Sequence, residues 1–375
     1  MTFFTPTKIV ISPDLGKLLR ETAARNFLIL SSKSAAEKSG GLSDIVEALS
    51  NEKKQYIYEN SITPNPTVQS IDFLYKKYCN EHIDAIISIG GGSVIDAGKA
   101  LNLCLANKVD CSTLIKLDYS RFSKILHIAI PTTCGTGSET SKGAILSDYE
   151  NEWKGGVRGE NIFCDVAILN PNYLFSLPLQ TCLATGFDAV SHAIETYISR
   201  AATTITKSLS LASLRLLIPA LIKLSEKRDT SALSTIERQD LLVGSCIAGI
   251  NLANSSTCLP HRLQYCIGSI TNTAHVDGVA LLYPAWLENL KRNNCEDLFE
   301  IHQFLRAYDI LNTQNPIVEL QRRMNILKTP EDLGLCYEMK DKLVELASGA
   351  LNLDPGYNGQ ETIDTIFEET LSCKQ

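Results

Sequence analysis

The sequence predicts an α/β domain followed by an all-helical domain, with the active site in the cleft between them. Up to about residue 177, short β-branched runs alternate with amphipathic stretches, which is typical of a parallel sheet covered by helices. From residue 178 onward, apolar residues recur at helical spacing and no segment reads as a strand. We therefore expect a parallel-sheet domain over residues 1–177 and a helical domain over residues 178–375.

Individual elements follow from the same patterns. The predicted strands are Asn26–Leu30, Gln55–Tyr58, Asp84–Ile89 and Ile125–Pro131. The predicted helices are Ser34–Ser50 and Val68–Glu81 in the first domain, and Leu179–Ser199, Ile205–Ser225 and Thr235–Asn254 in the second. The polar block Cys295–Cys336 gives no clear pattern.

Composition excludes several functional classes. The net charge of −7 argues against a broad basic surface for nucleic acid or anionic lipid. The N-terminal residues do not resemble an export signal, and the apolar stretches are too short to span a bilayer. The twelve cysteines are scattered without a CxxC pair, so we expect free, buried thiols in a reducing cytoplasm.

A glycine-rich turn follows the apolar strand that ends near Ile89. Gly90, Gly91, Gly92 and Ser93 stand where a strand meets a helix. Their backbone N–H groups and the helix dipole favour an anion such as a phosphate. The alternative is a tight turn that needs glycine only for its backbone conformation.

A second polar turn follows the next strand. It contains Thr132, Thr133, Thr136 and Ser138, whose hydroxyl groups suit ribose, pyrophosphate or a nicotinamide amide. An ordinary Gly/Thr loop is the alternative. Two such turns after successive strands strengthen the prediction of a nucleotide site.

The metal hypothesis rests on one carboxylate and three imidazoles. Asp188 and His192 are four residues apart, which places both on one face of a helix. His261 and His275 follow, and the four side chains together suit Fe²⁺ or Zn²⁺ with an open position. The other histidines, His82, His127 and His302, we interpret as core or surface residues.

These four motifs, in this order and spacing, resemble the iron-containing (group III) alcohol dehydrogenases. The resemblance extends from about Thr7 to Leu287 and includes Asp96 in the first loop. It implies a Rossmann-like first domain and one divalent iron on the four ligand positions. It also implies a nicotinamide nucleotide on the two loops, with Lys154 as a residue that contacts cofactor near the reaction.

Two departures from the family pattern affect the expected chemistry. Many members have a histidine that relays protons four residues after the third ligand, whereas this sequence has Tyr265, which we take as the substitute. After the second predicted strand, an acidic residue that binds the ribose is replaced by Ser32, with Lys33 beside it. This favours NADPH, or use of both NADPH and NADH.

Two further segments are similar to the phosphonoacetaldehyde reductases, which form 2-hydroxyethylphosphonate. The segments are Leu259–Tyr265 and Leu281–Leu287. In this interpretation Arg262 and Arg158 bind the phosphonate. The alternative is that Arg262 forms an internal ion pair and Arg158 is a solvated loop residue.

The sequence leaves three other functions open. The first is a general dehydrogenase of short aliphatic alcohols or diols, and the second is a lyase similar to dehydroquinate synthase. The third is a metal- or nucleotide-binding protein without catalysis. For a dehydrogenase of this family we expect a small aldehyde or alcohol as the substrate, which could be a phosphonate, no nucleic-acid or membrane partner, and a homodimer, as is common in the family.

Overall fold

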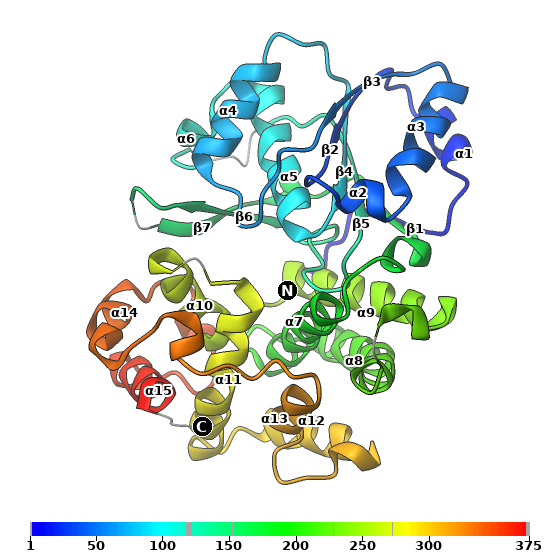
Figure 1. Ribbon diagram of the computed structural model, residues 1–375. Helices are drawn as coiled ribbons and strands as arrows, with labels where there is room; N and C mark the ends of the chain where they lie inside the picture. The colour runs from blue at the N-terminus through cyan, green and yellow to red at the C-terminus, as the bar shows by residue number, and fades with distance from the viewer. Residues whose placement is uncertain (1, 118–121, 152, 228, 272, 373–375) are drawn as a thin grey trace.

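The computed structural model of the chain describes residues 2–117, 122–151, 153–227, 229–271 and 273–372. A parallel sheet with flanking helices is followed along the chain by a group of helices stacked beneath it (Figure 1). The expected fold class is therefore confirmed. Pro178, where we placed the start of the second domain, is the N-cap of the first long helix of that group.

Six strands form the main sheet in the order β1-β8-β5-β4-β2-β3, and every neighbouring pair is parallel. The strands are β1 (Lys8–Ile11), β2 (Asn26–Leu30), β3 (Gln55–Glu59), β4 (Ala85–Gly90), β5 (Leu126–Pro131) and β8 (Val166–Leu169). All of β4 is buried, as a parallel strand covered on both faces should be. The four predicted strands match to within a residue, whereas β1 and β8 are too short to show a pattern.

Helices cover both faces of this sheet, because successive side chains of a strand point to opposite sides. On one face, Ile29 and Ile87 pack against α1 (Leu15–Arg20) and α3 (Gly41–Asn51). On the other face, Leu28 and Ile86 pack against α4 (Val68–Tyr78) and α5 (Gly92–Asn107). The smaller helices are α2 (Ala35–Lys38) and α6 (Cys111–Leu114).

The expectation of one continuous helix over Ser34–Ser50 is wrong. Gly40 has a φ of 80° and separates α2 from α3. This left-handed conformation carries little penalty for glycine but interrupts a helix.

A separate two-stranded antiparallel sheet is formed by β6 (Gly143–Asp148) and β7 (Trp153–Arg158). The β6 strand contacts α5 of the first domain, and β7 contacts α10 (Leu259–Ile270) of the second. In Figure 1 this hairpin lies between the two layers of the molecule. The sequence does not reveal it, because Gly155 and Gly156 weaken the strand pattern.

The second domain is helical throughout its described residues. Besides α10 its helices are α7 (Leu179–Ile198), α8 (Thr204–Ser225), α9 (Thr235–Asn254), α11 (His275–Arg292), α12 (Glu296–Arg306), α13 (Pro316–Arg323), α14 (Lys340–Leu346) and α15 (Gln360–Ser372). The three predicted helices agree with α7, α8 and α9 to within a residue. Tyr283 and Trp286 are fully buried in the centre of one apolar core that these helices share.

By length and composition, α8 meets the requirement for a membrane span, as does the bent pair α9 and α10 taken together. However, 44% of the most apolar part of α8 is buried inside the protein, and α8 packs on α7 and α9, as a core helix does. The cysteines within the described ranges are free and mostly buried, as expected.

Candidate metal centre and active site

The four predicted metal-binding residues come together from three helices. Asp188 and His192 lie on one face of α7, His261 lies in the first turn of α10, and His275 begins α11. One potential ligand atom from each residue lies within 4.8 Å of the other three. The Asp188 Oδ1 atom is 3.5, 3.8 and 3.9 Å from the Nε2 atoms of His261, His275 and His192, respectively.

The chemistry of this cluster fits a divalent metal. Ligand atoms held by tetrahedral bonds of about 2.1 Å are separated by roughly 3.4 Å, close to the separations observed here. Asp188 Oδ1 and His261 Nε2 are buried and have no hydrogen-bond partner among the described residues. Buried polar atoms are nearly always paired, so these two are explained by a ligand that the protein chain does not supply.

Burial and neighbouring charges shift the pKa values of the four residues in different directions. Burial lowers the pKa of His192 to about 4 and that of His275 to about 3, so both rings are neutral near pH 7. Burial also opposes the charged form of His261, but Glu195 and Asp188 outweigh it and raise its pKa to about 10. For Asp188, burial is outweighed by the three histidines, which hold its pKa well below the ordinary value. A metal ion at Nε2 would therefore compete with a proton on His261, whose charged form the two carboxylates favour.

Two residues that support the ligands are not among the predicted site residues. Glu195 Oε1 accepts a hydrogen bond from His261 Nδ1 at 2.7 Å, and Gln264 Oε1 accepts one from His275 Nδ1 at 2.6 Å. The sequence spacing could have indicated Glu195. It follows Asp188 by seven residues and His192 by three, which places it on the same helix face.

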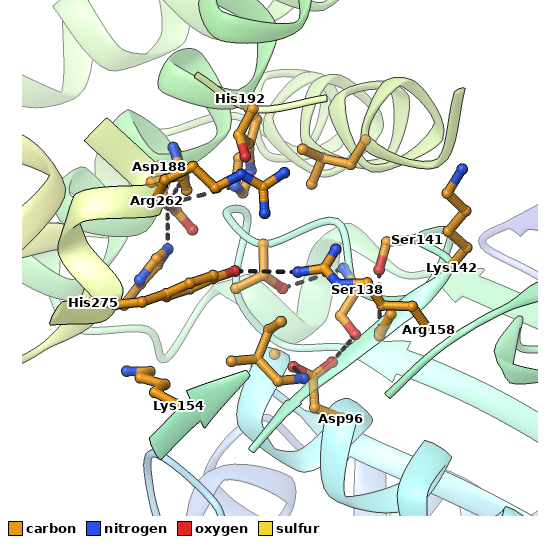
Figure 2. Close-up of a pocket in the computed structure, with 18 of the residues that line it drawn as sticks. Asp96, Ser138, Ser141, Lys142, Lys154, Arg158, Asp188, His192, Arg262 and His275 are labelled. Atoms are coloured by element: carbon orange, nitrogen blue, oxygen red, sulfur yellow. Dashed lines mark hydrogen bonds and ion pairs between the residues drawn. The ribbon is translucent and has the colours of Figure 1, made fainter. Parts of the chain in front are cut away.

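The cluster opens into a cavity of about 310 Å³ between the two domains. Its walls come from both nucleotide loops, the β6–β7 hairpin, and helices α7, α10 and α11. The predicted site residues in its lining are Gly92, Ser93, Asp96, Thr136, Ser138, Lys154, Arg158, Asp188, His192, His261, Arg262, Tyr265 and His275. Figure 2 shows Asp96 and Ser138 on the side opposite Asp188, His192 and His275.

The two predicted nucleotide loops lie against each other at the carboxyl ends of β4 and β5. A Cβ atom on Gly92 would lie 2.5 Å from both Cγ2 and Oγ1 of Thr136, so the second loop requires glycine in the first. Ser138 donates a hydrogen bond to Asp96, whose other carboxylate oxygen accepts the N–H of Ile145 at 2.9 Å. Packing against Thr136 is by itself a sufficient reason for glycine at position 92. These contacts therefore fit a purely structural turn as well as a phosphate-binding loop.

Six other predicted nucleotide-binding residues lie outside the lining of this cavity. They are Ser32, Lys33, Gly90, Gly91, Thr132 and Thr133. Ser32 and the exposed Lys33 follow β2, and the Thr132 N–H donates to the carbonyl of Gly90 at 3.0 Å. The cavity therefore contains only part of the predicted nucleotide surface.

Cationic side chains gather on the cavity wall. Arg158 and Lys154 extend from β7, and Arg262 follows the ligand His261 on α10 (Figure 2). Lys142, which the sequence analysis does not identify, also lines the cavity. Burial lowers the pKa of Lys154 to about 8, so it still carries its proton at pH 7.

The structure contradicts the internal ion pair of Arg262 and the loop position of Arg158, although Arg158 is exposed to solvent. No carboxylate in the described ranges forms an ion pair with Arg262, whose Nη2 donates to Ser256 Oγ at 2.9 Å and whose buried Nε has no partner. Arg158 is exposed but belongs to a strand, and its Nη2 donates to the Tyr265 hydroxyl at 3.5 Å.

The remaining histidines lie away from the centre. His127 Nε2 is 2.9 Å from Ser88 Oγ in the sheet interior, and burial lowers its pKa to about 3. His82 is exposed beside Asp84, and His302 is buried in α12.

Comparison with known proteins agrees with this architecture. A family model described as iron-containing alcohol dehydrogenase matches residues 6–171, and the C-terminal model of the same family matches residues 182–371. Alcohol dehydrogenase 4 of Saccharomyces cerevisiae is 28% identical over 82% of this chain and 81% of its own length. NAD-dependent methanol dehydrogenase of Bacillus methanolicus is 29% identical over 73% of this chain and 71% of its own length.

Solved structures extend the likeness to the whole fold. The crystal structure of an iron-containing alcohol dehydrogenase superposes with a TM-score of 0.87 at 24% identity, covering 100% of this chain and 99% of the other. Both domains, in the same order, are thus accounted for. The chain belongs to the iron-containing alcohol dehydrogenase family and is an oxidoreductase of that family.

Proposed function

We propose that the protein is a metal-dependent aldehyde reductase that converts phosphonoacetaldehyde to 2-hydroxyethylphosphonate with a nicotinamide cofactor. Family membership supports the general activity on alcohols and aldehydes. The observation that carries the finer proposal is the pair of arginines, Arg262 and Arg158, in the same cavity as the four metal-binding residues.

Arg262 has the properties of an anion-binding group. Burial, opposed by Tyr265 and assisted by Arg158, lowers the pKa of its guanidinium, so the charged form is less well stabilised there than in water. An incoming dianion would offset both the desolvation and the repulsion between the two arginines. A guanidinium also matches the geometry of phosphonate oxygens, because its N–H groups form parallel pairs of hydrogen bonds.

The charge balance of the metal centre supports this role. Two buried carboxylates, Asp188 and Glu195, offset the charge of a divalent ion. The negative charge of a phosphonate must therefore be met mainly by Arg262, Arg158 and the nearby lysines. A plain aldehyde such as butanal would leave these cations without a partner.

In the proposed reduction the side chains of the cavity transfer a proton and hold the substrate. When bound, a divalent metal supplies a Lewis acid for the carbonyl and the reduced nicotinamide supplies the hydride. The Tyr265 ring stacks on His275 with centroids 6.4 Å apart, and Arg158 holds its hydroxyl group at the cavity wall. Because both residues line the cavity, we assign to this hydroxyl the transfer of a proton to the product oxygen, with the protonated Lys154 amine as the second donor. The arginines hold the substrate's remote end, so its binding energy orients the carbonyl.

The remaining assignments complete the proposal. Fe²⁺ is the expected metal and Zn²⁺ the alternative, since both accept this ligand set. The absence of an acidic side chain at Ser32, together with the exposed Lys33, favours NADPH over NADH. We further propose that the protein is a cytoplasmic homodimer without nucleic-acid or membrane partners.

The proposal is tested by steady-state oxidation of NADPH, with NADH in parallel, by anaerobically iron-loaded protein. Phosphonoacetaldehyde should give a far higher kcat/KM than acetaldehyde or butanal. Arg262→Met should lower kcat/KM for phosphonoacetaldehyde about 10- to 100-fold, because a hydrogen bond to a charged group contributes about 1.5–3 kcal/mol. Arg158→Met should cost at most about 5-fold, as expected for an exposed pair.

The control is the plain aldehyde, for which Arg262→Met should retain the kcat/KM of the unmodified protein. Arg158→Met is not used in this control, because Arg158 also holds the Tyr265 hydroxyl. If acetaldehyde or butanal is reduced as efficiently as phosphonoacetaldehyde, the protein is a general alcohol dehydrogenase and Arg262 is structural. Conversion of substrate without net cofactor oxidation would indicate the lyase, and no turnover at all would indicate a non-catalytic protein.

A further inference from the structure

One buried carboxylate links all three helices that carry the metal-binding residues. Glu195 extends from α7, has no exposed surface, and accepts hydrogen bonds through both oxygens. Its Oε1 accepts from His261 Nδ1 at 2.7 Å and from the Tyr283 hydroxyl of α11 at 3.2 Å. Its Oε2 accepts from the N–H of Cys258, the N-cap of α10, at 2.7 Å.

From this geometry we infer that Glu195 is a positioning residue that makes His261 the principal anchor of the metal. An ionised carboxylate can only accept hydrogen bonds, so the contact keeps the proton on Nδ1 of His261. The lone pair of the neutral ring is then fixed on Nε2, which is the unpaired atom 3.5 Å from Asp188 Oδ1. A carboxylate behind an imidazole also raises its basicity as a ligand.

The hydrogen-bond partner of His275 fixes the position of the imidazole proton less strictly. Gln264 Oε1 accepts from His275 Nδ1, but the other end of the same amide is a donor, and its buried Nε2 has no partner among the described residues. Rotation of the amide would present a donor to Nδ1 and move the imidazole proton to Nε2, toward the metal. Of these two partners, the carboxylate of Glu195 excludes this state and the amide of Gln264 does not.

Glu195→Gln therefore changes little in volume but much in hydrogen bonding. A glutamine has one accepting oxygen, whereas Glu195 faces donors on both sides. Either Cys258 N–H faces an NH₂ group, or His261 Nδ1 accepts from the amide and its proton moves to Nε2. The second outcome directly removes a metal-binding lone pair.

Asp354 provides a matched control for the structural part of this role. It too is fully buried, and its Oδ2 accepts the N–H of Leu259, the residue after Cys258, at 2.9 Å, and Trp286 Nε1 of α11 at 2.7 Å. It thus supports the start of the same helix and the same neighbouring helix without contacting a ligand. Asp354→Asn should lower stability and leave the metal-binding atoms unaffected.

The experiment measures metal affinity by chelator competition with Zn²⁺, and the visible absorption of the Co²⁺-loaded protein, on the full chain. We expect Glu195→Gln to weaken metal binding about 10- to 100-fold and to change the Co²⁺ spectrum, as loss of such a partner typically does. Asp354→Asn should remain within about 3-fold of the unmodified protein by the same reasoning. Equal affinities for Glu195→Gln and the unmodified protein, or equal losses in both variants, would overturn the inference.

A second measurement needs no Glu195 variant and stands even if that variant does not fold. Proton NMR of the Zn²⁺-loaded protein should show a slowly exchanging imidazole N–H of His261, absent from His261→Ala. Failure to detect it would contradict the assigned tautomer. The inference rests on the metal site of the proposed function, yet the two fail differently: an unmodified protein that binds no metal refutes the proposed function, whereas tight binding unaffected by Glu195→Gln refutes only this role.

Discussion

Lys154 should lower the stability of the free protein at neutral pH. Burial lowers the pKa of its ammonium from 10.5 to about 8, and no carboxylate of the described residues pairs with it. Within the described ranges its Nζ donates only to Asn65 Oδ1, at 3.3 Å. At about 1.36 kcal/mol per pKa unit, the cost of holding the charged form is at most about 3 kcal/mol, since part of the side chain is still screened by water.

The sign of the pH dependence follows from proton linkage. Between pH 8 and 10.5 the unfolded chain retains the Lys154 proton and the folded protein has lost it, so stability rises with pH through this window. The cost is fully present below pH 8. By the same linkage, less than about 1 kcal/mol remains at pH 10.

Lys154→Met removes the charge and keeps a side chain of similar length. The variant should be more stable than the unmodified protein by up to about 3 kcal/mol at pH 7, and the gain should shrink to under about 1 kcal/mol at pH 10. Urea unfolding at both pH values, on metal-free protein without nucleotide, measures the difference. Packing effects of methionine cancel between the two pH values. A gain that is the same at pH 7 and pH 10 would refute the reasoning.

Two further predictions concern substitutions of Gly137, in the second nucleotide loop, and Gly92, in the first. Gly137 has a φ of 57°, and an added Cβ would lie 2.5 Å from the Cα of Gly249 in α9. Gly137→Ala should therefore lower the free energy of unfolding by about 2–5 kcal/mol, combining the left-handed backbone penalty with overpacking against backbone; unchanged thermal unfolding would contradict this. In Gly92→Ala the added Cβ meets a side chain, that of Thr136, so we expect a raised KM for the nucleotide. The Thr136 Cβ atom would itself lie 2.8 Å from the added Cβ, so relief of the clash requires glycine at position 136. The double variant Gly92→Ala, Thr136→Gly should return this KM to that of Thr136→Gly alone, and a double variant as impaired as Gly92→Ala would show that the clash is not the cause.

Much of the fold was predictable because its signals are local. The buried run of β4 and the helical periodicity of α7, α8 and α9 each lie within one segment, and these boundaries agree with the sequence to within a residue. The spacing of Asp188 and His192 likewise fixes one helix face before any tertiary contact is known. The glycine turn after β4 follows from the conformational demands of a strand that enters a helix.

Other features depend on contacts that no local pattern contains. The hairpin of β6 and β7 has little strand signal of its own and owes its place to packing on α5 and α10. Glu195 and His261 are 66 residues apart, so their hydrogen bond exists only because α7 and α10 pack together. The break at Gly40 likewise interrupts a segment whose apolar spacing reads as a single helix.

The fold class and the four residues of the Asp188, His192, His261 and His275 cluster could be predicted from the sequence alone. This is possible because residue type and periodicity report which groups are buried and which chemistry they offer. Three properties depend on the folded chain: among the described residues neither Arg262 nor Lys154 pairs with a carboxylate, and Glu195 accepts a hydrogen bond from His261. These properties belong to pairs of distant residues, and the packing of the two domains brings such pairs together.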